Sequence, residues 1–149
     1  MTGMNTAGAG LTITPLKIIN DDRGAVMHML RADAGVFVGF GEIYFSVVNP
    51  GAVKAWKRHR EMTLNLCCVS GAIRLVVFDA AEGTVREIDL GPGRPETYNL
   101  VTVAPGLWTG FTCIGDAPAV LANCANIPHN PAEAEGLPAD TNGIPYTWP

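Results

Sequence analysis

The chain has 149 residues, of which 48% are hydrophobic and 16% are charged, a composition typical of a protein with a buried core and not of a disordered chain. The formal net charge is −4, which argues against a nucleic-acid-binding protein, because nucleic-acid-binding domains carry a basic surface. No apolar run approaches the ~20 residues that a membrane span needs, and the first ten residues lack the basic and apolar regions of a signal peptide.

Short apolar segments separated by Gly and Pro are typical of an all-β protein. Residues 1–10 are expected to form a flexible arm and residues 11–149 a single domain. Strands are predicted over 11–19, 25–30, 42–48, 63–69, 72–78, 84–90, 98–103, 106–114 and 119–126. The tail over 127–149 contains five prolines and no periodicity, so we expect an ordered coil that lies over the sheets. About ten short strands favour a jelly-roll barrel or sandwich.

The four cysteines, Cys67, Cys68, Cys113 and Cys124, have no Cys-x-x-Cys spacing. Neighbouring strand residues point to opposite faces, so Cys67 and Cys68 are poor disulfide partners. We therefore expect reduced, buried thiols in a cytoplasmic protein that has neither nucleic-acid nor membrane partners.

The densest cluster of charge lies in the segment 51–65. Its charged residues include Lys54, Lys57, Arg58, His59 and Arg60. A basic cluster in an acidic protein suits a small anionic ligand, and the alternative is a solvated face. On an unbroken strand Lys57 and His59 share one face, and Lys54 lies on the other. A buried lysine either loses its charge or pairs with an anion, unless the strand bends and Lys57 points to water.

The same segment has the spacing of the first metal-binding motif of the cupin superfamily, G-x5-H-x-H-x4-E-x6-G, with Lys57, His59 and Leu64 at the ligand positions. In the second motif Thr109 stands where the histidine belongs. A divalent metal needs three or four N, O or S donors, and only His59 remains as one. The chain therefore resembles a cupin whose metal ligands are replaced, and we expect no bound metal.

Further matches make the sequence similar to the dTDP-4-dehydrorhamnose 3,5-epimerase family, in particular to its short, metal-independent members. The matching segments, in the order of the family, are 22–24, 42–46, 49–51, 53–59, 62–66, 70–71, 104–108 and 144–149. The resemblance implies a jelly-roll homodimer, without a cofactor, whose barrel holds a 4-keto-6-deoxyhexose linked to a nucleoside diphosphate such as dTDP. It implies proton abstraction next to the keto group and reprotonation on the other face of the ring, in deoxysugar biosynthesis for surface polysaccharides.

The resemblance also implies substrate contacts, for residues at the positions of the family's motifs. Arg23 matches the arginine of the family's D-x-R-G motif, Lys54 matches the arginine of its R-G-x-H motif, and His129 falls at or beside its acidic tyrosine. The predicted substrate contacts are Arg23, Lys54, Arg60, Asn65, Trp108, Thr109 and His129. For Trp108 packing in the core or in a dimer interface is the alternative to stacking on the ligand.

The predicted catalytic residues are His59, Lys57 and Tyr44. Lys57 stands where the family has its catalytic histidine, so either Lys57 is the base, or His59 is the base and Lys57 stabilises the enolate, which we favour. Tyr44 is an acid on the neighbouring strand or an ordinary strand tyrosine. The resemblance places the aspartate that partners the base beyond Pro149, and Glu133 in the tail is expected to be solvated or structural.

Two functions stay open at this point. The first is a sugar-nucleotide 3- or 3,5-epimerase-like isomerase, and the second is a nucleotide-sugar-binding cupin that has lost the chemistry. A metal-dependent cupin is disfavoured by the replaced ligands.

Overall fold

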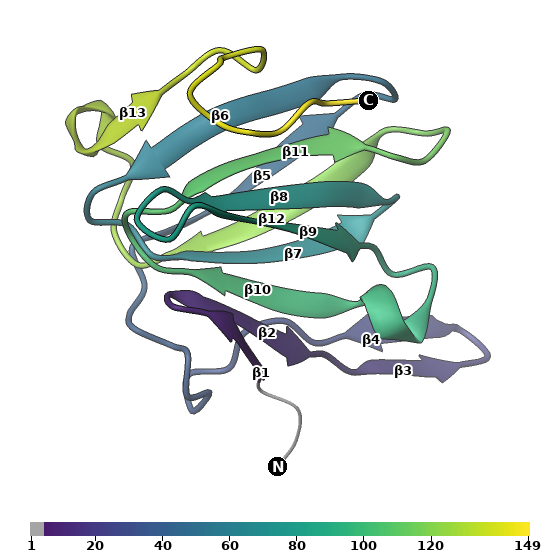
Figure 1. Ribbon diagram of the computed structural model, residues 1–149. Coiled ribbons are helices and arrows are strands. Elements are labelled where there is room, and N and C mark those ends of the chain that lie inside the picture. Colours follow the sequence, from purple (N-terminus) through teal and green to yellow (C-terminus); the bar gives the residue numbers. More distant parts are fainter. Residues whose placement is uncertain (1–4) are drawn as a thin grey trace.

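The computed structural model describes residues 5–149 (Figure 1) and consists almost entirely of antiparallel strands. The strands are β1 (Asn5–Gly8), β2 (Leu11–Pro15), β3 (Ile18–Asp21), β4 (Gly24–Met27), β5 (Glu42–Val48), β6 (Val53–His59), β7 (Leu64–Ser70), β8 (Ile73–Asp79), β9 (Thr84–Leu90), β10 (Asn99–Val103), β11 (Trp108–Cys113), β12 (Ala119–Ala125) and β13 (Ala134–Gly136). Two short 3-10 helices are η1 (Pro95–Thr97) and η2 (Pro131–Glu133). No described helix has the length and hydropathy that crossing a membrane requires.

Two sheets face each other, and a separate hairpin of β3 and β4 projects beside them (Figure 1). The six-stranded sheet has the order β1-β2-β10-β7-β12-β5, and the five-stranded sheet has the order β13-β6-β11-β8-β9. This is the jelly-roll sandwich that the strand pattern predicts.

The core lies between the inner faces of the two sheets. It includes Leu64, Leu66, Ile73, Leu75, Val77, Ile88, Leu90, Val101, Val103 and Leu121. Burying each such side chain stabilises the fold by about 1.5–3 kcal/mol. The four cysteines are unpaired and buried, as predicted.

The strand boundaries confirm most of the predicted elements, and 42–48 and 84–90 are strands from end to end. The strand predicted over 11–19 is divided after Pro15, because proline has no N–H with which to continue the ladder. Of the arm expected over residues 1–10, Asn5–Gly8 is strand β1, paired with β2, and residues 1–4 lie outside the described residues.

The tail is not coil throughout, because β13 adds a strand to the five-stranded sheet beside β6 (Figure 1, yellow-green). Beyond β13, Ile144 and Trp148 pack on the outer face of this sheet against Trp56 and Trp108. Both faces of the five-stranded sheet are therefore covered, which explains why β8 is buried on both sides.

Strand β6 is not the regular strand that the sequence predicts. Thr109 of β11 pairs with Lys57 and the next residue, Gly110, pairs with Ala55, so Trp56 is an extra residue opposite β11. Such a bulge reverses the alternation of side chains. As a result, Lys54 lines the same cleft as Lys57, in contrast to the prediction that the two lysines lie on opposite faces.

Candidate active site

A cleft of about 350 Å³ opens between the two sheets. Its apolar lining consists of Ala55, Trp56, Leu64, Leu66, Leu75, Phe111 and Leu121, and its polar lining of Tyr44, Ser46, Lys54, Lys57, His59, Thr109 and Asn123. A larger depression of about 410 Å³ beside β1 and β9 has two acidic residues, Asp79 and Glu82, and one basic residue, Arg86, in its lining, so it suits an anion less well than a cleft with two lysines. The cleft between the sheets is therefore the candidate site for a negatively charged ligand.

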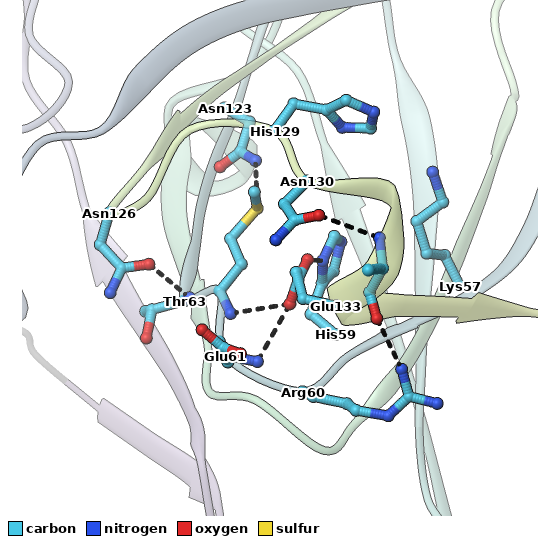
Figure 2. Close-up of polar contacts among 12 residues, drawn as sticks. Lys57, His59, Arg60, Glu61, Thr63, Asn123, Asn126, His129, Asn130 and Glu133 are labelled. Atoms are coloured by element: carbon cyan, nitrogen blue, oxygen red, sulfur yellow. Dashed lines mark hydrogen bonds and ion pairs between the residues drawn. The ribbon is translucent and has the colours of Figure 1, made fainter.

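His59 and Glu133 form a buried pair at this cleft (Figure 2). The Glu133 carboxylate binds Nδ1 of His59, and 7% of His59 and 3% of Glu133 are exposed. The carboxylate also accepts hydrogen bonds from the backbone N–H groups of Glu61, at 3.0 Å, and Met62, at 3.2 Å. Burial acts to raise the pKa of Glu133, but the bonds from His59 and from the two N–H groups outweigh it, so the pKa lies below its ordinary value.

A charged Glu133 determines which imidazole nitrogen of His59 can act. A carboxylate only accepts hydrogen bonds, so Nδ1 carries a proton, and Nε2 is the nitrogen left for a molecule in the cleft. A neutral imidazole held in this tautomer is a base whose protonated form the carboxylate stabilises.

The tail carries Glu133 to His59 through local contacts around η2. The side-chain oxygen of Asn130 accepts a hydrogen bond from the N–H of Ala132 at 3.1 Å and caps this short helix. Arg60 donates its backbone N–H to the Glu133 carbonyl at 2.8 Å and its guanidinium to the Ala132 carbonyl at 3.1 Å. The tail is thus attached to the end of β6, where His59 lies.

The basic segment divides its cations between two environments. Lys54 and Lys57 line the cleft, are exposed, and have no ion-pair partner within residues 5–149. Arg58 and Arg60 instead bind Glu135 of the tail, at 2.8 Å and 3.5 Å. Lys57 reaches solvent, so the sequence argument from burial of a lone lysine does not apply, and the two lysines are available to an anionic ligand.

Tyr44 and Asn123 meet on the opposite side of the cleft from β6. The side-chain N–H of Asn123 donates to the Tyr44 oxygen at 2.9 Å, and its oxygen accepts the backbone N–H of Asn65 at 2.9 Å. The Asn65 side chain is buried and accepts a hydrogen bond from Thr102 at 2.6 Å. Asn65 therefore holds the side chain of Asn123 in place and does not itself line the cleft.

Of the predicted residues, Tyr44, Lys54, Lys57, His59 and Thr109 come together in the cleft. Arg60, Asn65, Trp108, His129 and Arg23 do not line it.

The environments of Arg60 and Asn65 are described above, and those of Trp108, His129 and Arg23 differ from one another. Trp108 is buried in a cluster with Trp56 and lies under the guanidinium of Arg58, whose Cζ is 4.8 Å from the ring centre. His129 is exposed in the loop after β12. Arg23 lies at the tip of the β3–β4 hairpin, with 90% of its side chain exposed and an ion pair to Asp21 at 2.8 Å.

Two polar residues of the site were missed. Glu133 is buried against His59 and not solvated, and nothing in the aperiodic tail indicates this. Asn123 is a polar residue within the apolar run of β12, which is a usable signal because buried polar groups need partners. Within residues 5–149 no group of three or more His, Cys, Asp or Glu side chains is arranged to hold a metal ion.

The chain is similar to known proteins both in sequence and in structure. No protein-family model matches the chain. The chain is 29% identical to the probable low-salt glycan biosynthesis epimerase Agl13 of Haloferax volcanii, over 91% of each chain. The chain is also 43% identical in sequence to a dTDP sugar isomerase from Desulfovibrio desulfuricans whose crystal structure is known. The two structures superpose with a TM-score of 0.89 over 93% of this chain and 90% of that chain.

The same fold is found in a protein of much lower sequence identity. A dTDP-6-deoxy-D-glucose-3,5-epimerase of Legionella pneumophila, in complex with dTDP-4-keto-L-rhamnose, is 18% identical with a TM-score of 0.82. The alignment covers 98% of this chain and 82% of that chain. At this identity the likeness concerns the fold, and it spans nearly the whole of the present chain.

Proposed function

Because the chain belongs to the dTDP-4-dehydrorhamnose 3,5-epimerase family, we propose that it is a sugar-nucleotide isomerase that moves a proton next to the keto group of a 4-keto-6-deoxyhexose linked to dTDP or another nucleoside diphosphate. The product would serve deoxysugar biosynthesis for a surface polysaccharide. The observation that carries the proposal is the buried His59–Glu133 pair at a cleft that also contains two lysines without ion-pair partners in the described part of the chain.

The cleft suits such a ligand in each of its parts. Lys54 and Lys57 supply positive charge for a pyrophosphate or an enolate oxygen. Leu64, Leu75 and Phe111 offer an apolar surface for the deoxygenated part of the sugar.

The proton transfer uses groups of the protein alone. Nε2 of His59 takes the proton from the carbon next to the keto group, and the electron pair of the C–H bond moves to form an enolate. The ammonium of Lys57 stabilises the oxygen of the enolate. Glu133 stabilises the imidazolium that forms. Tyr44 then returns a proton to carbon. The His59 imidazolium releases its proton to water and the Tyr44 phenolate takes one proton from water, so both groups return to their starting forms.

Incubation with dTDP-4-keto-6-deoxyglucose in D2O, followed by NMR, tests the proposal. We expect deuterium at C3, at C5 or at both, and His59→Ala and Lys57→Ala should each reduce its incorporation. Absence of deuterium above the buffer control, with several nucleotide sugars, would refute the enzyme. If nucleotide sugars raise the melting temperature without exchange, the chain is a binding module, because a ligand that binds only the native state stabilises it.

We also propose that the protein is a cytoplasmic homodimer. An apolar row on the outer face of the edge strand β5 supports the dimer, with 51% of Ile43, 63% of Phe45 and 54% of Val47 exposed. The unpaired, buried cysteines support a reducing compartment. Light scattering should give twice the chain mass of 15.8 kDa for the native protein and a smaller mass for Phe45→Glu. A native protein at the mass of one chain would refute the dimer.

A further inference from the structure

The side-chain amide of Asn123 has only one orientation that satisfies its neighbours. Asn123 lies on β12, directly opposite Tyr44 of β5, and is 3% exposed. One end of its amide meets the backbone N–H of Asn65, which can only donate, so this end is the oxygen. The other end is therefore the NH2 group, and it donates to the Tyr44 oxygen at 2.9 Å.

This arrangement decides what the Tyr44 hydroxyl can do. Because its oxygen accepts from Asn123, its single proton must point elsewhere. Within the described residues the acceptor in reach of this proton is the sulfur of Met62, which lies 4.0 Å away and is a weak acceptor. Tyr44 lines the cleft, so a ligand oxygen or carbon there is the stronger recipient.

Tyr44 and His59 reach the cleft from opposite sheets. Tyr44 belongs to β5 in the six-stranded sheet, and His59 belongs to β6 in the five-stranded sheet. A sugar ring held between them has one face towards each side chain. Tyr44, acting as the acid, therefore returns a proton to the ring face opposite the one from which His59 removes it.

We propose that Asn123 is a positioning residue that directs the Tyr44 proton into the cleft and stabilises the phenolate after that proton has moved to carbon. The inference rests on the proposed function. The bond from the Tyr44 oxygen to its hydrogen breaks and a C–H bond forms, the enolate electron pair goes into the new bond, and the negative charge stays on the Tyr44 oxygen beside the Asn123 N–H until water reprotonates it.

The decisive measurement is the ratio of product to deuterated, recovered substrate in D2O. Tyr44→Phe leaves His59 able to remove and return the proton on one face, so exchange into substrate continues while product formation falls. In Asn123→Asp the carboxylate still accepts from Asn65 but now also accepts the phenolic proton, which draws that proton out of the cleft. We expect the ratio to fall by about 10²-fold in both variants.

Three further variants complete the design. The double variant Tyr44→Phe/Asn123→Asp should match Tyr44→Phe alone, because Asn123 acts through Tyr44. Asn126→Asp is the matched control. The Asn126 oxygen likewise accepts a backbone N–H, that of Thr63 at 2.7 Å (Figure 2), but Asn126 does not line the cleft, so the ratio should equal that of the native protein. Asn123→Ser, which is uncharged and too short to reach Tyr44, replaces Asn123→Asp if that variant does not fold.

The outcomes separate the inference from the proposed function. If the native protein shows no exchange, the proposed function fails. If the native protein exchanges and forms product, but a folded Asn123 variant keeps the native ratio, the inference is overturned. Equal losses of exchange and of product would likewise overturn it, since they indicate a structural role for Asn123.

Discussion

Replacing Glu133 by glutamine keeps the volume of the side chain and removes the charge that holds His59. The glutamine oxygen can still accept from the N–H groups of Glu61 and Met62, at 3.0 and 3.2 Å in the native protein. The neutral amide no longer stabilises an imidazolium, and its NH2 group can donate to Nδ1 and so favour the wrong tautomer. Losing the orienting carboxylate of a catalytic histidine costs about 10²–10⁴-fold in turnover.

The effect on stability follows from the same three contacts. Hydrogen bonds to a charged group contribute about 1.5–3 kcal/mol and those to a neutral group about 1 kcal/mol. Glu133→Gln weakens the contacts with the two N–H groups and with His59, so we expect a loss of about 1–3 kcal/mol. For a chain of this size that loss lowers the melting temperature by about 3–10 °C.

The pH dependence of stability has a defined sign. The pKa of Glu133 is below its ordinary value of 4.5, because its hydrogen bonds outweigh the effect of burial. The stability that the ionised carboxylate contributes is therefore complete above pH 4.5 and is lost as the pH falls through the folded-state pKa. The difference in unfolding free energy between the native protein and Glu133→Gln should shrink on acidification over this range.

The assay is deuterium exchange at saturating dTDP-4-keto-6-deoxyglucose, combined with thermal unfolding. Glu135→Gln is the matched control, since Glu135 lies two residues further on and forms only half-exposed ion pairs with Arg58 and Arg60. Such pairs contribute about 0–1 kcal/mol. If a folded Glu133→Gln variant exchanges within about threefold of the native rate, the assignment of His59 and Glu133 as base and partner is wrong.

Three other outcomes are open to measurement. Lys57→Met should lower exchange by about 10²–10³-fold and leave the melting temperature unchanged, because Lys57 is exposed; an unchanged rate would remove Lys57 from the mechanism. Prolonged dialysis against EDTA should not alter exchange, and a loss restored by a divalent metal would contradict acid–base catalysis by side chains alone. Gly110→Ala should destabilise the fold by about 1–3 kcal/mol, because a Cβ there would lie 2.6 Å from Cβ of Ala55 and 2.8 Å from the Trp148 ring. An unchanged melting temperature would contradict this, since it would show that Ala55 and Trp148 move aside without loss of stability.

The positions of the strands could be predicted from the sequence because they depend on local patterns. Apolar and β-branched residues with turn residues at both ends define β5 and β9 without reference to the rest of the chain. The sharing of the cleft by Lys57 and His59 is local too, since two residues of the same parity on one strand point the same way.

The bulge at Trp56 could not be predicted in this way. It depends on Gly110 of the adjacent strand and on the tail, which exchanges backbone hydrogen bonds with Trp56 through Leu137 at 2.9 and 3.1 Å. The bulge changes the parity of β6 and so brings Lys54 into the cleft, where the sequence pattern placed it on the opposite face.

The sequence by itself determined the strands, the jelly-roll class and the loss of the metal ligands, since each depends on residue types at short spacings. Only the tertiary structure decided the partner of His59, because Glu133 lies 74 residues further along the chain, in a tail without periodicity. The same holds for Asn123, which meets Tyr44 across 79 residues of sequence. A contact over such a separation depends on how whole sheets and the tail pack, and no local pattern of side chains records that packing.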